Sequence, residues 1–123
     1  MRQVEKLLVV LWCFSFGAIL IPSLIPIGAT AAVSDKVLHV LAFSFVSALS
    51  LMAFRQKRSI LRALAVVVLV GIASEAGQLL VPGRQASLLD LLADFVGVAL
   101  GVPLGMLGAA VMMRVASRLK PTA

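Results

Sequence analysis

The chain has 123 residues, of which 62% are hydrophobic and 13% charged, and its mean hydropathy is +1.13. A water-soluble domain is roughly half apolar and about a quarter charged, so the composition excludes a soluble fold. The net charge of +6 does not predict nucleic-acid binding, because the cations lie at the ends of apolar runs rather than in a basic stripe with interleaved aromatic residues.

The first apolar run predicts a transmembrane helix over residues 7–25, which is long enough to cross a hydrocarbon core of about 30 Å. An alternative stays open, because Arg2, Lys6, the apolar run and the Ala-Thr-Ala segment at 29–31 also fit a cleaved signal peptide. The run is long for such a signal, so we expect a retained helix. Loss of residues 1–31 in an intact-mass measurement would show cleavage.

Three further apolar runs predict transmembrane helices over residues 36–54, 62–81 and 88–114. A Pro82-Gly83 turn signal ends the third helix. The segment Ser87 to Asp90 has the form of a capping box at the start of the fourth, and Pro103 predicts a kink within it. The fold class is therefore an all-α membrane protein, a single domain over residues 1–123 with four transmembrane helices and short loops.

The cations divide unequally between the two sides of this predicted bundle. One side has nine of them: Arg2, Lys6, Arg55, Lys57, Arg58, Arg62, Arg114, Arg118 and Lys120. The other side has only Lys36 and Arg84. Because positive residues favour the cytoplasmic side, the distribution predicts that both termini lie in the cytoplasm. The cations on that side are expected to contact anionic membrane lipids.

Most of the remaining ionisable residues lie near the opposite, outer side. The set is Asp35, Lys36, His39, Glu75, Gln78, Arg84, Asp90 and Asp94. A charged group at membrane depth costs about 2.5–3.5 kcal/mol on insertion scales, so it usually faces a partner or a water-filled cavity. The pattern favours an outward-facing polar pocket for a ligand. The alternative is a structural network with ion pairs such as Glu75 to Arg84 or Asp90 to Lys36.

One face of the fourth helix combines acidic residues with glycines. At about 100° per residue, Asp90 and Asp94 share a face with four glycines, namely Gly97, Gly101, Gly105 and Gly108. Glycines at this spacing let helix backbones approach closely. We expect this face to pack inside the bundle, with a homo-oligomer formed through it as an alternative.

The acidic residues of the outer set outnumber the cations, with four carboxylates against Lys36 and Arg84. Three kinds of compensation stay open: a proton shared between Asp90 and Asp94, an imidazolium at His39, or a bound cation or cationic ligand group. The shared proton is the simplest of the three.

Metal binding and catalysis have weaker signals. His39, Glu75, Asp90 and Asp94 have donors for a hard or borderline divalent cation, but the chain has no HExxH or comparable motif and only one cysteine. The sequence therefore predicts no metal site and no cofactor. His39 and Asp35, four residues apart, have the spacing of an oriented base, yet no catalytic residue is assigned and binding is favoured over catalysis.

Several short motifs resemble the VanZ-like family. They are Asp35-Lys36-Val37-Leu38-His39, Glu75-Ala76-Gly77-Gln78, Pro82-Gly83-Arg84, Ser87, Asp90 and the segment 97–101. They follow the family's order along the chain. The chain departs from the pattern at Asp94, where many relatives have asparagine. The resemblance implies a multi-pass protein of the bacterial cytoplasmic (inner) membrane, in a family whose name-giving member is associated with low-level resistance to the glycopeptide teicoplanin.

Three functional hypotheses follow. The leading one is a cell-envelope protein whose outer pocket binds a lipid-linked or peptidyl cell-wall component, with a link to glycopeptide resistance. The second is an intramembrane enzyme that acts on an envelope lipid by carboxylate and histidine acid–base chemistry. The third is a small proton-coupled carrier, although polar groups near one face give no continuous pathway unless the protein oligomerises.

Overall fold

The structure is a computed structural model that describes residues 2–23, 32–82 and 87–119. These residues form four helices, and no strand occurs among them: α1 (Arg2–Ser23), α2 (Ala32–Ala53), α3 (Lys57–Gln78) and α4 (Leu88–Arg118). All four are long and apolar enough to cross a membrane. The predicted all-α membrane fold with four transmembrane helices is therefore confirmed.

The helix ends differ from the predicted ones by several residues. The first three helices begin earlier than expected, and α4 continues to Arg118. The reason is that apolar runs mark the part of a helix inside hydrocarbon, whereas the helical backbone continues into the polar interface, where charged side chains meet water. In contrast, α3 ends at Gln78, one turn before Pro82, with turn hydrogen bonds from the Leu80 and Val81 N–H groups.

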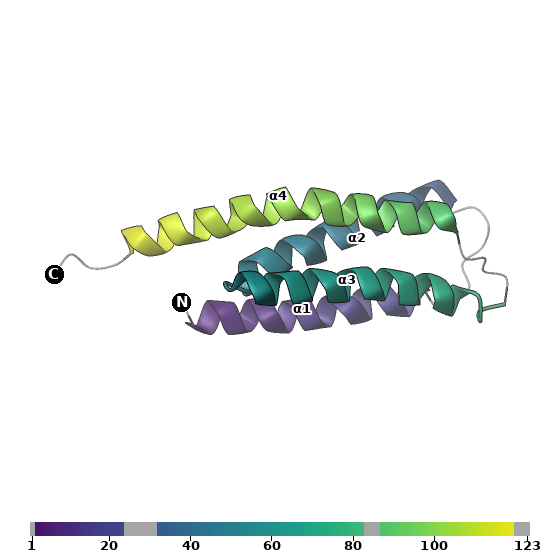
Figure 1. Ribbon diagram of the computed structural model, residues 1–123, viewed down its shortest axis with the longest axis horizontal. Helices are drawn as coiled ribbons and strands as arrows, with labels where there is room; N and C mark the ends of the chain where they lie inside the picture. Colours follow the sequence, from purple (N-terminus) through teal and green to yellow (C-terminus); the bar gives the residue numbers. More distant parts are fainter. Residues whose placement is uncertain (1, 24–31, 83–86, 120–123) are drawn as a thin grey trace.

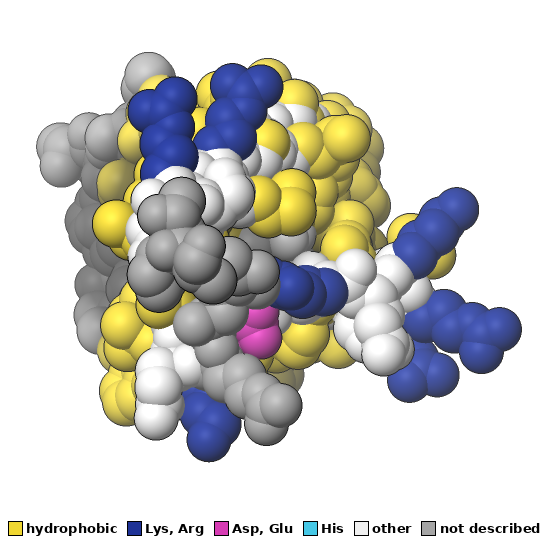
Figure 2. All heavy atoms as spheres, turned by 90° about the vertical axis from the view of Figure 1, so that its left-hand side faces the viewer, with side chains coloured by type: hydrophobic (Ala, Val, Ile, Leu, Met, Phe, Trp, Pro, Cys, Tyr) yellow, Lys and Arg dark blue, Asp and Glu magenta, His cyan; other side chains and the backbone are white. Residues whose placement is uncertain are grey.

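The helices run alternately up and down, so α2 and α4 are parallel to each other and antiparallel to α1 and α3 (Figure 1). We call the end at which α1 begins and α4 ends the cationic end. Figure 2 shows that Lys and Arg side chains gather there and that acidic side-chain atoms lie among them. At this end Arg55 Nε lies 2.8 Å from Glu5 Oε1. The opposite end, where α2 and α4 begin and α3 ends, is called the polar end.

The closest helix packing is between α2 and α4, and glycines on α4 make it possible. A Cβ atom built on Gly97 would lie 2.7 Å from the Val40 carbonyl oxygen, and one built on Gly105 would lie 2.7 Å from that of Ala48. At Gly101 the clash would be with the Ser44 backbone. The glycine face is therefore covered by α2 of the same chain, so a homo-oligomer, which stays a prediction, would need another surface.

Helix α1 is held by an aromatic contact rather than by glycines. The Trp12 Nε1–H group donates a 2.8 Å hydrogen bond to Ser50 Oγ of α2, and the Trp12 ring packs edge-on against Phe16 and Phe54. A small apolar core of Ile19, Phe43, Val46 and Val67 fills the centre. Most other large apolar side chains are exposed, as expected for a surface that faces lipid.

Candidate functional site

The polar end brings together the predicted site residues that the structure describes. Asp35, Lys36 and His39 lie in the first turns of α2, Glu75 and Gln78 in the last turns of α3, and Asp90 and Asp94 in the first turns of α4. Arg84 lies outside the described residues. We call these seven described residues the polar cluster.

The outer part of the polar cluster is an ion pair between α2 and α4. Lys36 Nζ donates a 2.6 Å hydrogen bond to Asp90 Oδ1. The Lys36 side chain is 39% exposed, whereas that of Asp90 is 9% exposed. This pair is one of the two that the structural-network alternative predicts. The lysine therefore neutralises a nearly buried carboxylate while its own side chain stays partly exposed.

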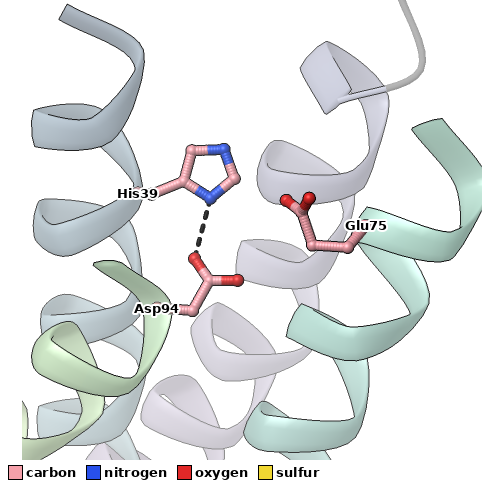
Figure 3. A group of neighbouring side chains, drawn as sticks. All are labelled: His39, Glu75 and Asp94. Atoms are coloured by element: carbon pink, nitrogen blue, oxygen red, sulfur yellow. Dashed lines mark hydrogen bonds and ion pairs between the residues drawn. The ribbon is translucent and has the colours of Figure 1, made fainter. Parts of the chain in front are cut away.

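Below this pair, a second contact joins the same two helices. His39 Nδ1 lies 2.7 Å from Asp94 Oδ1, and both side chains are buried. The imidazole also stacks on Phe43, with ring centroids 6.3 Å apart. From the sequence, Asp35 has the spacing to orient His39; in the structure the Asp94 carboxylate lies against Nδ1 of the imidazole (Figure 3). The difference arises because the Gly97–Gly101 contact brings α4 close to α2.

Glu75 connects α3 to the start of α4. The Ser87 N–H group donates a 2.9 Å hydrogen bond to Glu75 Oε2. The predicted capping box is thus wrong in its contacts: Ser87 is the N-cap residue, but its side chain makes no cap hydrogen bond, and the Asp90 carboxylate binds Lys36. A capping box needs a carboxylate on the N-cap N–H, and Glu75 supplies it from another helix.

Several buried polar atoms have no hydrogen-bond partner among the residues that the structure describes. They are Ser47 Oγ, Ser74 Oγ, Glu75 Oε1, Gln78 Nε2 and Asp94 Oδ2. An unpaired buried polar group costs about 1–3 kcal/mol, and a charged one more. Glu75 and Asp94 each have one carboxylate oxygen without a partner among these residues, so the inner part of the cluster can accept a hydrogen bond or bind a cation.

Gly71 explains how Asp94 fits between the helices. A Cβ atom at this position would lie 2.9 Å from Asp94 Oδ2 and 3.1 Å from Phe43 Cε1. The missing side chain thus leaves space for the Asp94 carboxylate against α3. Gly71 shares its helix face with Glu75 and Gln78, so the sequence places these three residues on one stripe but does not indicate which partner requires the glycine.

The sequence interpretation did not single out Ser74 or Trp12. Ser74 is fully buried next to Glu75, and its spacing of three from Gly71 and four from Gln78 was a usable signal. Trp12 had no such signal, because a tryptophan in an apolar run can face either lipid or another helix.

A large groove lies elsewhere in the molecule. It has a volume of about 1030 Å³ and a mainly apolar lining at the cationic end, which includes Val4, Leu51, Met52, Met106 and Met112. It is therefore separate from the polar cluster at the other end of the helices. The outward-facing pocket predicted at the cluster stays a prediction.

A sequence model of the VanZ/LLP1 family matches residues 5–114. This match covers most of the chain and includes every residue of the polar cluster. No curated protein and no solved structure matches the chain with significance.

Proposed function

The chain belongs to the VanZ/LLP1 family, and from this membership and its polar end we propose that it binds an anionic cell-envelope component, lipid-linked or peptidyl, at the outer surface of the bacterial cytoplasmic membrane. The cationic end would face the cytoplasm, as the positive-inside rule requires. The polar cluster would then open toward the side on which cell-wall assembly takes place.

The observation that supports binding is the partly exposed Lys36 side chain at the polar end. It is held by Asp90 at 2.6 Å, yet 39% of the side chain remains accessible. An ammonium group can donate three hydrogen bonds, so it can bind a phosphate or carboxylate while keeping Asp90. Arg84, which follows α3 in the sequence, would add a guanidinium suited to the same anions.

Binding by the purified protein tests this proposal. Lys36→Gln should weaken binding of a polyprenyl-linked precursor or of a free stem peptide by about 10-fold, which corresponds to about 1.4 kcal/mol. If Lys36→Gln weakens binding of both ligands, Lys36 recognises an anionic group that the two share. If it weakens binding of only one, that ligand is the source of the anion. Lys57→Gln at the cationic end is the matched control and should bind normally. Unmeasurable binding of both ligands by the wild-type protein would end the proposal.

A link to glycopeptide resistance is part of the same proposal. A protein that occupies precursors at the outer surface would change how much of them glycopeptides reach. In a strain whose teicoplanin susceptibility changes on deletion of the gene, Lys36→Gln should behave like the deletion, and Lys57→Gln like the wild type. Wild-type susceptibility of the Lys36→Gln strain would separate binding from resistance.

A second candidate function is an intramembrane enzyme acting on an envelope lipid, and the pair of His39 and Asp94 favours it. A carboxylate 2.7 Å from Nδ1 fixes the orientation of an imidazole whose other nitrogen can act as a general base. Turnover of a polyprenyl phosphate substrate by the purified protein, lost in His39→Gln, would establish this function over simple binding.

A further inference from the structure

We propose that His39, Glu75 and Asp94 form a site for a divalent first-row metal ion, with Zn²⁺ and Mn²⁺ as the chemically suited ions. The three residues come from α2, α3 and α4, and all are buried. Their side chains converge between the helices, with the Glu75 carboxylate pointing toward His39 and Asp94 (Figure 3). This assignment reverses the expectation from the sequence, which contains no recognised metal motif.

The spacing of the donor atoms is close to that of a coordination sphere. One donor from each residue lies within 4.8 Å of the other two. Donors bound to tetrahedral zinc at about 2.0–2.2 Å lie about 3.3–3.6 Å apart. Donors that are 4.8 Å apart therefore need to approach by up to about 1.5 Å to bind one ion, which side-chain rotations can supply.

The charge and hydrogen bonding of the three residues favour a cation. Two carboxylates and one imidazole carry a negative surplus even when the imidazole is protonated. Glu75 Oε1 and Asp94 Oδ2 are buried without a hydrogen-bond partner among the described residues, and only 3% of Asp94 and 7% of Glu75 is exposed. A metal ion would compensate both oxygens at once, which one shared proton cannot do.

The ligand types narrow the choice of metal. Imidazole suits zinc and other first-row ions, whereas carboxylate oxygens suit manganese and magnesium. A set of one nitrogen and two oxygens therefore favours Zn²⁺ or Mn²⁺ over Ca²⁺, which prefers six to eight oxygen ligands. Three protein ligands also leave a position for water or an anionic ligand group.

This proposal goes beyond the binding function and does not depend on it, because that function rests on Lys36. It does bear on the enzyme alternative. A neutral imidazole has one lone pair, so a histidine that binds a metal cannot also act as a general base.

Direct metal binding by the wild-type protein is the first test. Untagged protein in detergent is stripped with a chelator, then titrated with Zn²⁺ or Mn²⁺, and metal per chain is measured by mass spectrometry after desalting. We expect about one ion per chain. The melting temperature of the protein should rise with the concentration of free metal. Substoichiometric metal and an unchanged melting temperature with both ions would overturn the proposal, without affecting the test of Lys36.

Matched variants locate the site. Asp94→Asn keeps the size of the side chain and an acceptor for His39, so this variant should fold. Asp94→Asn and Glu75→Gln should each weaken metal binding by about 10- to 100-fold or more. Glu5→Gln removes a carboxylate at the cationic end and should bind metal like the wild type. Co²⁺ absorption provides a reading on folded protein, since its ligand-field bands should change in Asp94→Asn. Wild-type affinity and spectra in both site variants would refute this site.

Discussion

At the scale of single residues, the polar cluster is held by pairs whose members come from different helices. Lys36 with Asp90 is partly exposed, whereas His39 with Asp94 is buried. A partly exposed ion pair contributes little to the free energy of unfolding, because water screens the attraction between the two charges. A buried pair behaves differently, because removal of one member leaves the other without compensation in a medium of low dielectric constant.

We therefore expect His39→Phe to destabilise the protein in the metal-free state by about 3–5 kcal/mol, since Asp94 would be left buried without its partner. The double variant His39→Phe/Asp94→Leu should lose less than the sum of the two single variants. The free energy of unfolding can be measured by the loss of helical circular dichroism during titration with a denaturing detergent. Additive losses would mean that the two side chains do not interact.

At the scale of helices, the approach of α4 to α2 creates the site. Gly97 and Gly101 place the α4 backbone against the carbonyl groups of α2. This close approach positions Asp94, about one turn before Gly97, at His39. Without a hydrophobic driving force between helices in lipid, such close packing is the main source of association. Packing along the glycine face and formation of the polar cluster are therefore coupled.

Gly101→Ala tests this coupling. The added Cβ atom would meet the Ser44 backbone and would lie 2.6 Å from Ser47 Cβ, so overpacking should cost about 1–3 kcal/mol of unfolding free energy. It should also weaken the contact between His39 and Asp94, visible as a shifted histidine NMR signal.

Gly17→Ala is the matched control, because nothing lies within 4 Å of a Cβ atom at that position. Its replacement should be neutral or stabilising by up to about 1 kcal/mol, since alanine is the better helix former. Equal unfolding free energies for the two variants would argue against close packing at Gly101.

At the scale of the whole molecule, the two ends of the bundle have opposite characters. The cationic end gathers Lys and Arg side chains (Figure 2), and the polar end contains four of the five acidic residues together with His39. Helix α4, at 31 residues, has a length of about 46 Å, which exceeds a hydrocarbon core of about 30 Å. It extends past the other helices at the cationic end (Figure 1), where Arg114 and Arg118 would reach the headgroup region.

The predicted orientation can be measured by cysteine labelling in intact cells. Cys13 is the only cysteine, so Cys13→Ser gives a cysteine-free background. Gln56→Cys and Ser117→Cys, both at the cationic end, should resist a membrane-impermeant thiol reagent until the cells are permeabilised, whereas Gln85→Cys between α3 and α4 should react directly. The reverse pattern would place the polar cluster in the cytoplasm and remove the basis for binding a cell-wall component.

The amino-acid sequence alone determined the class of protein, the number of helices and the residues that gather at the polar end. These properties depend on composition, on the length of apolar runs and on the 3.6-residue period, all of which are local along the chain. The glycine spacing also indicated a packing face on α4. Helix ends were less predictable, because hydropathy indicates which residues lie in the hydrocarbon core and not where the helical backbone ends.

The sequence named the Lys36–Asp90 pair as one alternative, but only the tertiary structure decided the other pairings across helices. The carboxylate at His39 comes from Asp94, 55 positions away, and the N–H of Ser87 is bound by Glu75 rather than by its neighbour Asp90. Such partners depend on the rotation and axial position of one helix against another, which the close backbone contact at Gly101 fixes. A helical period gives the face of a residue but not the depth at which another helix meets it. The sequence therefore offered His39, Glu75, Asp90 and Asp94 as possible metal donors, and only the assembled helices show that His39, Glu75 and Asp94 lie together.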